Sequence, residues 1–403
     1  MAGGKQTLSR KTLNFGLAIE VQQPAKLLVL GDLSLHGFVQ ANFGHSPGYT
    51  ALVQGLEAYD GITLANLECA LTMSENLNLE KITLHAEPQL LHELPRIDLF
   101  SLANNHISDA WEAGVRDTVN ALSQHGKAFF GYGSDILEAR KPVQIEKNDI
   151  RLGFLGYSCL STNGDNYATP VRPGVCPVAA ECFQTDIPRL KKTVDHVIVV
   201  LHWGEEHVHY PTPDQIAMAH RAIDLGASAI IGMHPHVIQG IERYRNGFIC
   251  YSLGNFIFSD VECDLTREGN RVRFFQRLLR ANKESIGVEF VIDKDRISLD
   301  TIKAYRLDRH FLPAEVPLSR LHTNLSKLNT RLAVYVKQNS DYLAKINGPQ
   351  LTKRFSDGKY NNHYLLTPIH GYPASLRARI FLGRLLSNTK RAFKGTFSGT
   401  GRN

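Results

Sequence analysis

The stretch IDLFSLANNHISDA, residues 97–110, decides what kind of fold the sequence predicts. Its first six residues are mostly apolar, which is typical of a buried strand. The strand then ends in Asn104, Asn105 and His106, and Asp109 follows one turn later. Polar side chains are costly to bury, so at the end of a core strand they either cap the next segment or carry out chemistry. The rest of the chain has to distinguish these two interpretations.

Strand-like and helix-like segments alternate on both sides of this stretch. The apolar runs KLLVLGD (26–32), DHVIVVLHWG (195–204) and ASAIIGMHPH (227–236) predict buried strands. EAGVRDTVNALSQHG (112–126) and PDQIAMAHRAIDLG (213–226) have the apolar spacing of helices. Such alternation indicates an α/β fold with a layered, largely buried sheet. Hairpin-like pairs, which show that the sheet is not purely parallel, occur at 143–158, 241–258 and 285–307.

The composition and the predicted elements change along the chain and divide it into four segments. A short N-terminal segment (1–24) precedes the main α/β domain (25–265), and additional strands (266–310) complete that domain. A C-terminal, mostly helical extension with a basic tail (311–403) follows. Its helical part is predicted by leucines at alternating steps of three and four, the spacing of one helix face: Leu318, Leu321, Leu325, Leu328 and Leu332. We expect this face to pack on the core, because a coiled-coil seam needs about three to four heptads.

The composition is that of an ordinary soluble protein. Of the 403 residues, 43% are hydrophobic and 21% are charged, and the net charge of +6 is too small to indicate a nucleic-acid partner. No apolar stretch reaches the about 18–20 residues that a membrane-spanning helix needs. The N-terminal apolar run FGLAI is too short for a secretion signal. The six cysteines form no CxxC pair, and Cys69, Cys159 and Cys250 lie in apolar, strand-like contexts, so we expect reduced packing roles for these three and a cytoplasmic location.

The basic tail, residues 374–403, contains seven Lys or Arg and no acidic residue. Apolar residues such as Leu376 and Phe381 are interleaved with Arg377 and Arg379, so the tail is a candidate for peripheral contact with an anionic membrane surface. The alternatives are a helix that packs on the main domain and a disordered end. A polar, Gly/Pro-rich linker at 347–373 precedes it.

Five predicted strands end in an ionisable or amide side chain. These residues are Asp32, Glu68, the pair Asn105 and His106, His202, and the pair His234 and His236. Taken singly, each has an ordinary interpretation as a turn, cap or core residue. Together they indicate a site, because groups at the C-terminal edge of an open α/β sheet converge on the crevice where ligands bind. Buried ionisable groups also need a charged partner or a metal.

The donor types indicate which metals fit. Imidazole, carboxylate and amide oxygen without thiolate suit Mn, Fe or Zn. Six candidate ligands exceed the needs of one tetrahedral ion, whereas two divalent metal ions about 3.5–4 Å apart that share a carboxylate would use them all. Such a pair lowers the pKa of a bridging water and stabilises charge on a phosphoryl or acyl oxygen. The predicted chemistry is hydrolysis or transfer at phosphorus, with amide hydrolysis as the alternative.

Six motifs occur in a characteristic order over roughly residues 25–260: GDLSLHG, NLECAL, ANNHISDA, LHWGEEH, GMHPHVIQG and YSLGNFIF. In this order they resemble the CapA family of bacterial capsule-synthesis proteins, which is typified by a poly-γ-glutamate protein. That family is similar to a divergent branch of the calcineurin-like metallophosphoesterases. The resemblance implies a four-layer α/β/β/α sandwich with a dinuclear metal centre.

The resemblance also implies a set of metal ligands. Asp32 and His236 would belong to the first metal, and Glu68 would be the bridging carboxylate. The ligands of the second metal would be Asn105, His202 and His234.

Further residues take roles around these ligands by the same resemblance. His106 would protonate the leaving group, and Asp109 would orient His106 or, alternatively, cap the turn. Asn104, Glu206 and Asn255 are candidates for substrate contact, and Asn104 is also a candidate for shaping the turn.

Two departures from the relatives affect these expectations. The wider superfamily usually begins with Asp-x-His, but Ser34 stands where that histidine would be, and His36 cannot be assumed to replace it. We therefore expect a first metal site that is weaker or completed by water. Many relatives also carry an N-terminal membrane anchor, which we do not find, and this argues against an extracytoplasmic role.

Three functions compete. The first is a metal-dependent hydrolase that serves capsule or surface-polymer synthesis, with a phosphoester or polymer substrate and a capsule synthase as a candidate partner. The second is a general cytoplasmic metallophosphoesterase. The third is a non-catalytic capsule assembly factor that retains a metal-binding fold. The pair Asn105 and His106 favours the first two, since a scaffold needs no proton donor beside a metal.

Overall fold

The computed structural model describes residues 23–40, 42–43, 46–162, 166–178, 180–340 and 343. The predicted linker and basic tail, and nearly all of the predicted N-terminal segment, lie outside the described residues. Contact between the tail and a membrane therefore stays a prediction. No helix among the described residues is long and apolar enough to cross a membrane.

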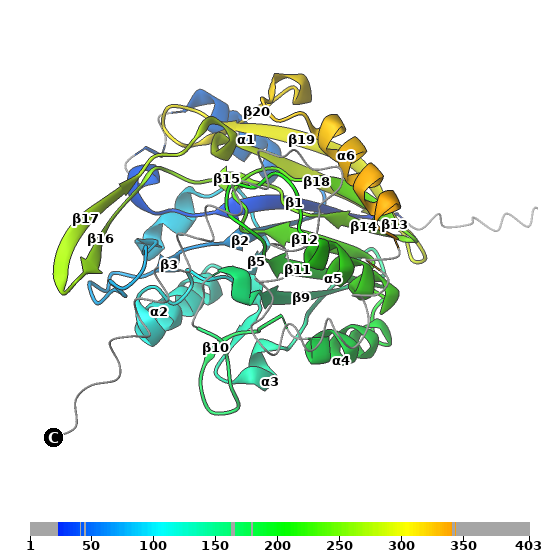
Figure 1. Cartoon of the computed structure of the whole chain (residues 1–403), viewed down its shortest axis with the longest axis horizontal. Helices are drawn as coiled ribbons and strands as arrows, with labels where there is room; N and C mark the ends of the chain where they lie inside the picture. Colours follow the sequence, from blue (N-terminus) through cyan, green and yellow to red (C-terminus); the bar gives the residue numbers. More distant parts are fainter. Residues whose placement is uncertain are drawn as a thin grey trace, which may run out of the picture.

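Two large β-sheets form the centre of the described structure (Figure 1). In the first, the strand order is β20 (Pro313–Val316), β19 (Ile297–Leu307), β18 (Glu284–Ile292), β1 (Ala25–Leu33), β2 (Ile62–Leu67), β5 (Leu99–Ser101) and β6 (Ala128–Phe130), with β15 (Asn255–Ile257) also paired to β1. In the second, the order is β13 (Ile241–Tyr244), β14 (Gly247–Cys250), β12 (Ala229–Met233), β11 (His196–His202), β9 (Ile150–Ser158) and β8 (Val143–Lys147). Both sheets are mixed, as the hairpins in the sequence predicted: β1, β2, β5 and β6 are parallel, whereas β18 is antiparallel to β1.

The two sheets pack face to face around a shared core. Along β1, Leu27 and Val29 join the core between the sheets, while Leu28 joins the core on the outer face. Along β11, Ile198 lies between the sheets and Val199 lies on the outer face. Helices cover both outer faces: α1 (Pro47–Glu57) and α2 (Trp111–Gln124) the first sheet, α4 (Ala180–Lys191) and α5 (Pro213–Asp224) the second. The layers are therefore helix, sheet, sheet, helix, and central strands such as β2, β11 and β12 are buried on both faces.

The three predicted hairpins are confirmed as β8–β9, β13–β14 and β18–β19. Asn148 and Asp149 turn the first of them with φ angles of 55° and 58°, the positive values that a two-residue type I′ turn requires. A further hairpin, β16 (Val261–Arg267) and β17 (Asn270–Gln276), reaches away from the two sheets (Figure 1). All six cysteines are buried, among them Cys69, Cys159 and Cys250, for which a packing role was expected.

The prediction of a mostly helical region from residue 311 is wrong at its start. β20 is an edge strand of the first sheet, and Leu318–Arg320 forms only a 3-10 turn. The single helical face from Leu318 to Leu332 is therefore broken: α6 (Leu325–Gln338) begins after Asn324, whose side chain accepts a hydrogen bond from the Lys327 backbone as an N-cap. The later leucines of the series, from α6, do pack on the core, as predicted.

Glu284, the first residue of β18, fastens the segment that leads into α6. Its carboxylate accepts hydrogen bonds from the backbone N–H groups of His322 (2.6 Å) and Thr323 (2.9 Å) and from the Arg306 guanidinium (3.0 Å). Burial raises the pKa of Glu284, but these donors outweigh burial, so the net pKa lies below its ordinary value.

We expect Glu284→Gln to lower the free energy of unfolding by about 2 kcal/mol at pH 7, because hydrogen bonds to a charged group are lost. Since the folded pKa is lowered, this contribution is present above the unfolded pKa, which is about 4.3. It disappears as the pH falls through the folded pKa. Urea unfolding of both chains from pH 7 downward measures this, and Glu315→Gln on the exposed side of β20 is the matched control. A difference that is the same at pH 7 and in acid would contradict the assignment.

Candidate metal centre

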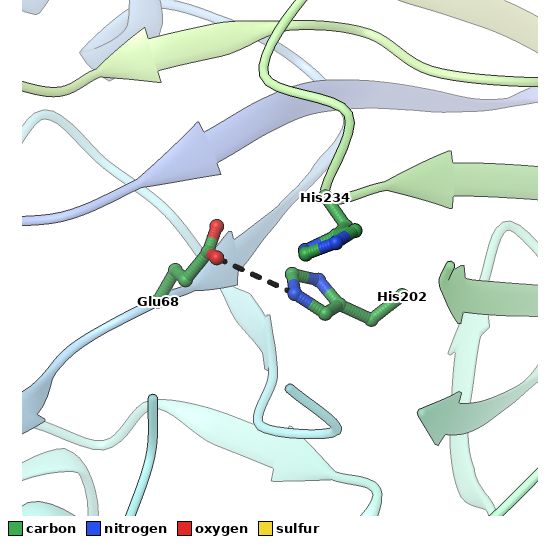
Figure 2. A group of neighbouring side chains, drawn as sticks. All are labelled: Glu68, His202 and His234. Atoms are coloured by element: carbon green, nitrogen blue, oxygen red, sulfur yellow. Dashed lines mark ion pairs between the residues drawn. The ribbon is translucent and has the colours of Figure 1, made fainter. Parts of the chain in front are cut away.

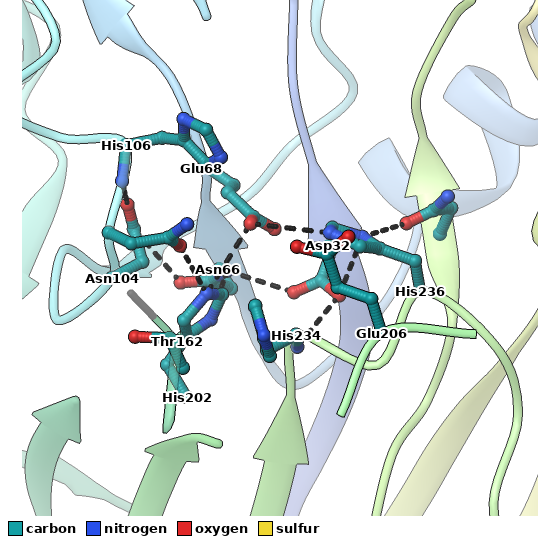
Figure 3. Close-up of polar contacts among 12 residues, drawn as sticks. Asp32, Asn66, Glu68, Asn104, His106, Thr162, His202, Glu206, His234 and His236 are labelled. Atoms are coloured by element: carbon teal, nitrogen blue, oxygen red, sulfur yellow. Dashed lines mark hydrogen bonds and ion pairs between the residues drawn. The ribbon is translucent and has the colours of Figure 1, made fainter. Parts of the chain in front are cut away.

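Six side chains that the sequence predicted as metal ligands meet at one edge of the two sheets. Figure 3 labels five of them, and the sixth, Asn105, contacts His202. They arrive from five strand ends, β1, β2, β5, β11 and β12, because parallel strands place their carboxyl ends at the same edge. Each of them is at most 8% exposed: Asp32, Glu68, Asn105, His202, His234 and His236.

Sheet register places Asp32 at the centre of this edge. Asn66 of β2 pairs with it on one side and Asn255 of β15 on the other. β15 approaches β1 closely enough that the Asp32 N–H donates to the Gly254 carbonyl, at 2.9 Å. A Cβ at Gly31 would lie 2.0 Å from that carbonyl oxygen, so only glycine fits at Gly31. The local sequence Gly-Asp is thus explained by chain packing at the site.

Glu68 lies between two groups of potential ligands. Its Oε1 is 3.3 Å from His202 Nε2, the contact drawn in Figure 2, and 3.6 Å from His236 Nε2. With His202 and His234 it forms one group whose ligand atoms lie within 4.8 Å of one another, and with Asp32 and His236 it forms a second. Neither carboxylate oxygen of Glu68 accepts a hydrogen bond from the described residues. Glu68 is therefore common to both groups.

Asn105 and His202 contact each other through two atoms that could each bind a metal, with the ring nitrogen donating to the amide oxygen in the absence of an ion. Asn105 Oδ1 is 2.8 Å from His202 Nε2. Two ligand atoms that bind one ion at about 2.1 Å and at a right angle lie about 3 Å apart. The spacing therefore fits two ligands of one metal, and the amide oxygen is the atom that a metal would bind.

The two histidines of the His-Pro-His turn have an unusual backbone conformation. His234 has a φ of 93° and His236 a φ of 56°. Both values lie in the left-handed region, which costs a non-glycine residue of order 1–3 kcal/mol. The His234 N–H donates to Asp32 Oδ2 at 3.1 Å, which ties this turn to β1. Such strain persists where the surrounding structure fixes it and is found mostly at functional sites.

Burial governs the electrostatics of the cluster. Burial raises the pKa of the Asp32 carboxyl, and burial together with the neighbouring Asp32 raises the pKa of Glu68 well above its usual range. Burial lowers the pKa of His234 to about 3 and that of His202 well below its ordinary value. The imidazoles are therefore neutral ligands, and the carboxylates lack a compensating charge. A divalent cation supplies that charge, so these residues fit a metal.

Sequence reasoning missed Asn66 as part of the site. Its Nδ2 donates to Asp32 Oδ1 at 2.9 Å and lies 3.3 Å from His202 Nδ1, and its Oδ1 accepts from Asn104 at 3.2 Å. Asn66 thus connects ligands from both sheets. Asn104 donates to the Leu67 carbonyl and accepts from the His106 N–H, so it shapes the turn. Its predicted substrate contact gains no support, because its polar atoms are already bonded.

His106 and Asp109 form a hydrogen-bonded pair. His106 Nδ1 lies 2.7 Å from Asp109 Oδ2, which also accepts from the Leu84 N–H at 2.6 Å. Lys81 makes an ion pair of 2.6 Å with Asp109 Oδ1 and donates to the Asn105 carbonyl. Burial raises the pKa of Asp109, but Lys81 and His106 outweigh it, so the net pKa is lowered. Asp109 is thus an ionised acceptor that fixes the His106 ring.

Glu206, Asn255 and His36, which the sequence analysis also named, make the following contacts. Glu206, a candidate for substrate contact, joins His234 and His236 in a third group of potential ligands. Asn255 Oδ1 lies 2.9 Å from His236 Nδ1, and its Nδ2 donates to the Asn282 carbonyl, so it holds the His236 ring. His36 contacts the backbone carbonyls of His85 and Glu262 and joins none of the three groups, so it does not replace the histidine missing at Ser34.

The fold and the site together define a two-sheet α/β protein with a candidate metal site at the carboxyl edge of its strands. The chain belongs to the bacterial capsule synthesis protein family PGA_cap, which it matches over residues 26–260. The resemblance drawn from the six motifs is thereby confirmed.

Two curated relatives come from Bacillus. The chain is 35% identical over 164 residues to the capsule biosynthesis protein CapA of Bacillus anthracis, a match that covers 40% of each chain. It is 36% identical over 173 residues to the PGA biosynthesis protein CapA of Bacillus subtilis, which covers 43% of this chain and 45% of the relative. The chain thus spans less than half the length of these two relatives.

The solved structures are less similar in sequence to this chain than the two Bacillus relatives are. A phosphatase from Mycoplasma pneumoniae has a TM-score of 0.44 and 15% identity, over 76% of this chain and 99% of that one. The calcineurin-like phosphoesterase YfkN of Bacillus subtilis has a TM-score of 0.37 and 13% identity, over 81% of this chain and 99% of the other. Scores and identities this low say nothing about what this chain binds.

Proposed function

We propose that this protein is a metal-dependent phosphoester hydrolase of the calcineurin-like type that serves capsule or surface-polymer synthesis. The observation that carries the proposal is the place of Glu68, whose oxygens are buried and without a hydrogen-bond donor between two groups of ligands. A buried carboxylate in that position fits two divalent ions. When bound, the ions would activate water and stabilise negative charge on the phosphoryl oxygens.

The chain's own residues would supply the remaining steps. Asp32, Glu68 and His236 would hold one ion, and Glu68 with Asn105, His202 and His234 the other. Asp109 holds His106 by Nδ1, which leaves Nε2 for the substrate. A water would attack phosphorus, the bond from phosphorus to the leaving oxygen would break, and that oxygen would take its proton from His106 Nε2.

We assign Glu206 to the first metal and not to the substrate. Its carboxylate lies with His234 and His236 in one group of potential ligands, and the superfamily histidine is missing because Ser34 stands in its place. A carboxylate there would restore the ligand count that the missing imidazole lowers.

The role in capsule synthesis rests on the family and on its Bacillus relatives, one of which is called a PGA biosynthesis protein. A general phosphoesterase would have the same site, so the two differ in substrate alone. A non-catalytic assembly factor would have no use for the ion-paired His106 and Asp109 beside the ligands.

Removal of metal tests the proposal directly. We expect the full chain, after treatment with a chelator, to hydrolyse p-nitrophenyl phosphate at least about 100-fold more slowly, because the ions contribute several kcal/mol to the transition state. Added Mn²⁺, Fe²⁺ or Zn²⁺ should restore turnover, with about two ions per chain by elemental analysis. A γ-glutamyl peptide serves as the amide alternative. A metal-free protein that cannot be reconstituted would overturn the proposal.

A further inference from the structure

A cavity of about 180 Å³ opens beside the ligand cluster. Its lining includes the polar residues Asn105, His106 and His236. It also includes five apolar residues, here called the apolar side: Ile82, Leu84, Phe258, Val261 and Leu278. A group that leaves with a proton from His106 would therefore enter a space that this apolar side helps to line.

The apolar side of the cavity is held in place by the surrounding structure. Leu84 donates its N–H to Asp109, the residue that fixes His106, and Leu278 donates its N–H to Asp260 Oδ1 at 2.8 Å. The Phe258 ring packs against His236 with 5.0 Å between ring centroids. Val261 and Leu278 stand at the two ends of the hairpin β16–β17, so the base of this hairpin forms part of the wall. The wall is fixed before any substrate binds, which favours binding of a matching group.

The charges around the cavity argue against an anionic leaving group. Among the described residues that line it, Lys81 is the one lysine or arginine. Its ammonium is already paired with Asp109, at 2.6 Å. Glu206, which lines the same cavity, adds no positive charge. A polyanionic chain would find no free positive charge here, whereas an uncharged apolar group would remove the wall from water.

We infer that the substrate is a phosphoester whose leaving alcohol is apolar near the ester oxygen. This inference rests on the proposed function, because His106 places the leaving group in the cavity. A cavity of about 150 Å³ with apolar walls holds one benzene. The space here accordingly fits one ring or one branched aliphatic unit next to the ester oxygen.

Two phosphate monoesters of equal charge test the inference. Benzyl phosphate and glycerol 1-phosphate both release a primary alcohol, so their intrinsic reactivity is similar. We expect kcat/KM of the Mn²⁺-loaded full chain to be about 10- to 100-fold higher for benzyl phosphate, as burial of one ring predicts. Benzylphosphonate, which cannot be hydrolysed, should also bind more tightly than glycerol 1-phosphonate in calorimetry.

A matched pair of variants locates the effect in the wall. Val261→Thr places a hydroxyl in the wall at nearly constant volume and should lower kcat/KM several-fold for benzyl phosphate alone. Val272→Thr makes the same change at an exposed position of the same hairpin and should alter neither substrate. Equal kcat/KM for the two esters, or a preference for glycerol 1-phosphate, would overturn the inference and leave the proposed function intact. Absence of turnover of both esters with every metal would overturn the proposed function and this inference with it.

Discussion

Replacing Glu68 by Gln should remove most of the metal from the purified protein. The substitution keeps the shape of the side chain but removes the charge that both groups of ligands share. We expect metal per chain to fall at least about 10-fold, since loss of even an outer partner of a metal typically costs 10–100-fold in affinity. Turnover should be lost with the metal. Elemental analysis of the purified chains measures the first effect and the p-nitrophenyl phosphate assay the second.

The same variant should behave in the opposite way once metal is absent. Burial and Asp32 raise the pKa of Glu68, so in the metal-free chain this group destabilises the fold increasingly as the pH rises above its unfolded pKa. Metal-free Glu68→Gln should therefore unfold at the same or a higher temperature than the metal-free parent at pH 7. Mn²⁺ should raise the unfolding temperature of the parent, by mass action, but not that of the variant. Glu75→Gln, an exposed change, is the control. Full metal content in Glu68→Gln would contradict the shared-ligand assignment.

The convergence of the ligands could be predicted from the sequence because it depends on one topological rule. Each predicted ligand follows an apolar strand, and parallel strands bring their carboxyl ends to one edge. The rule is sufficient for His202, because this residue is the last of β11 and no loop separates it from the strand. The same holds for Asp32, which lies near the end of β1.

Residues whose place depends on the register or on a loop could not be predicted in the same way. Asn66 was visible as an amide within a fully buried strand, but only the pairing of β1 with β2 sets it beside Asp32. Glu206 reaches the ligands from the loop after β11, where His207 adopts a φ of 63°. No periodicity in a sequence encodes a loop conformation of that kind.

The error in the C-terminal region has a local cause. Five leucines matched one helix face, but periodicity alone does not mark where a helix begins. The N-cap residue Asn324 was the signal that a helix begins at Leu325 and does not run through residues 318–323. The first residue of a helix is therefore predicted correctly only when capping residues are considered together with the apolar spacing.

Replacing His106 by Ala should lower kcat by about 10²- to 10⁴-fold while the metal content stays near that of the parent, because removal of a general acid costs a rate factor of this size. His106 belongs to none of the three groups of potential ligands, and Asp109 holds its ring. Asn105→Ala is the matched comparison at the neighbouring position: since Asn105 Oδ1 faces His202, this variant should lose metal and turnover together.

The dependence on the leaving group distinguishes a proton donor from a residue that merely positions substrate. p-Nitrophenolate is a stable anion and needs no proton as it departs, whereas benzyl alcohol must be protonated. The loss in His106→Ala should therefore be at least about 10-fold smaller for p-nitrophenyl phosphate than for benzyl phosphate. Equal losses for the two esters at unchanged metal content would show that His106 binds or orients the substrate without donating a proton.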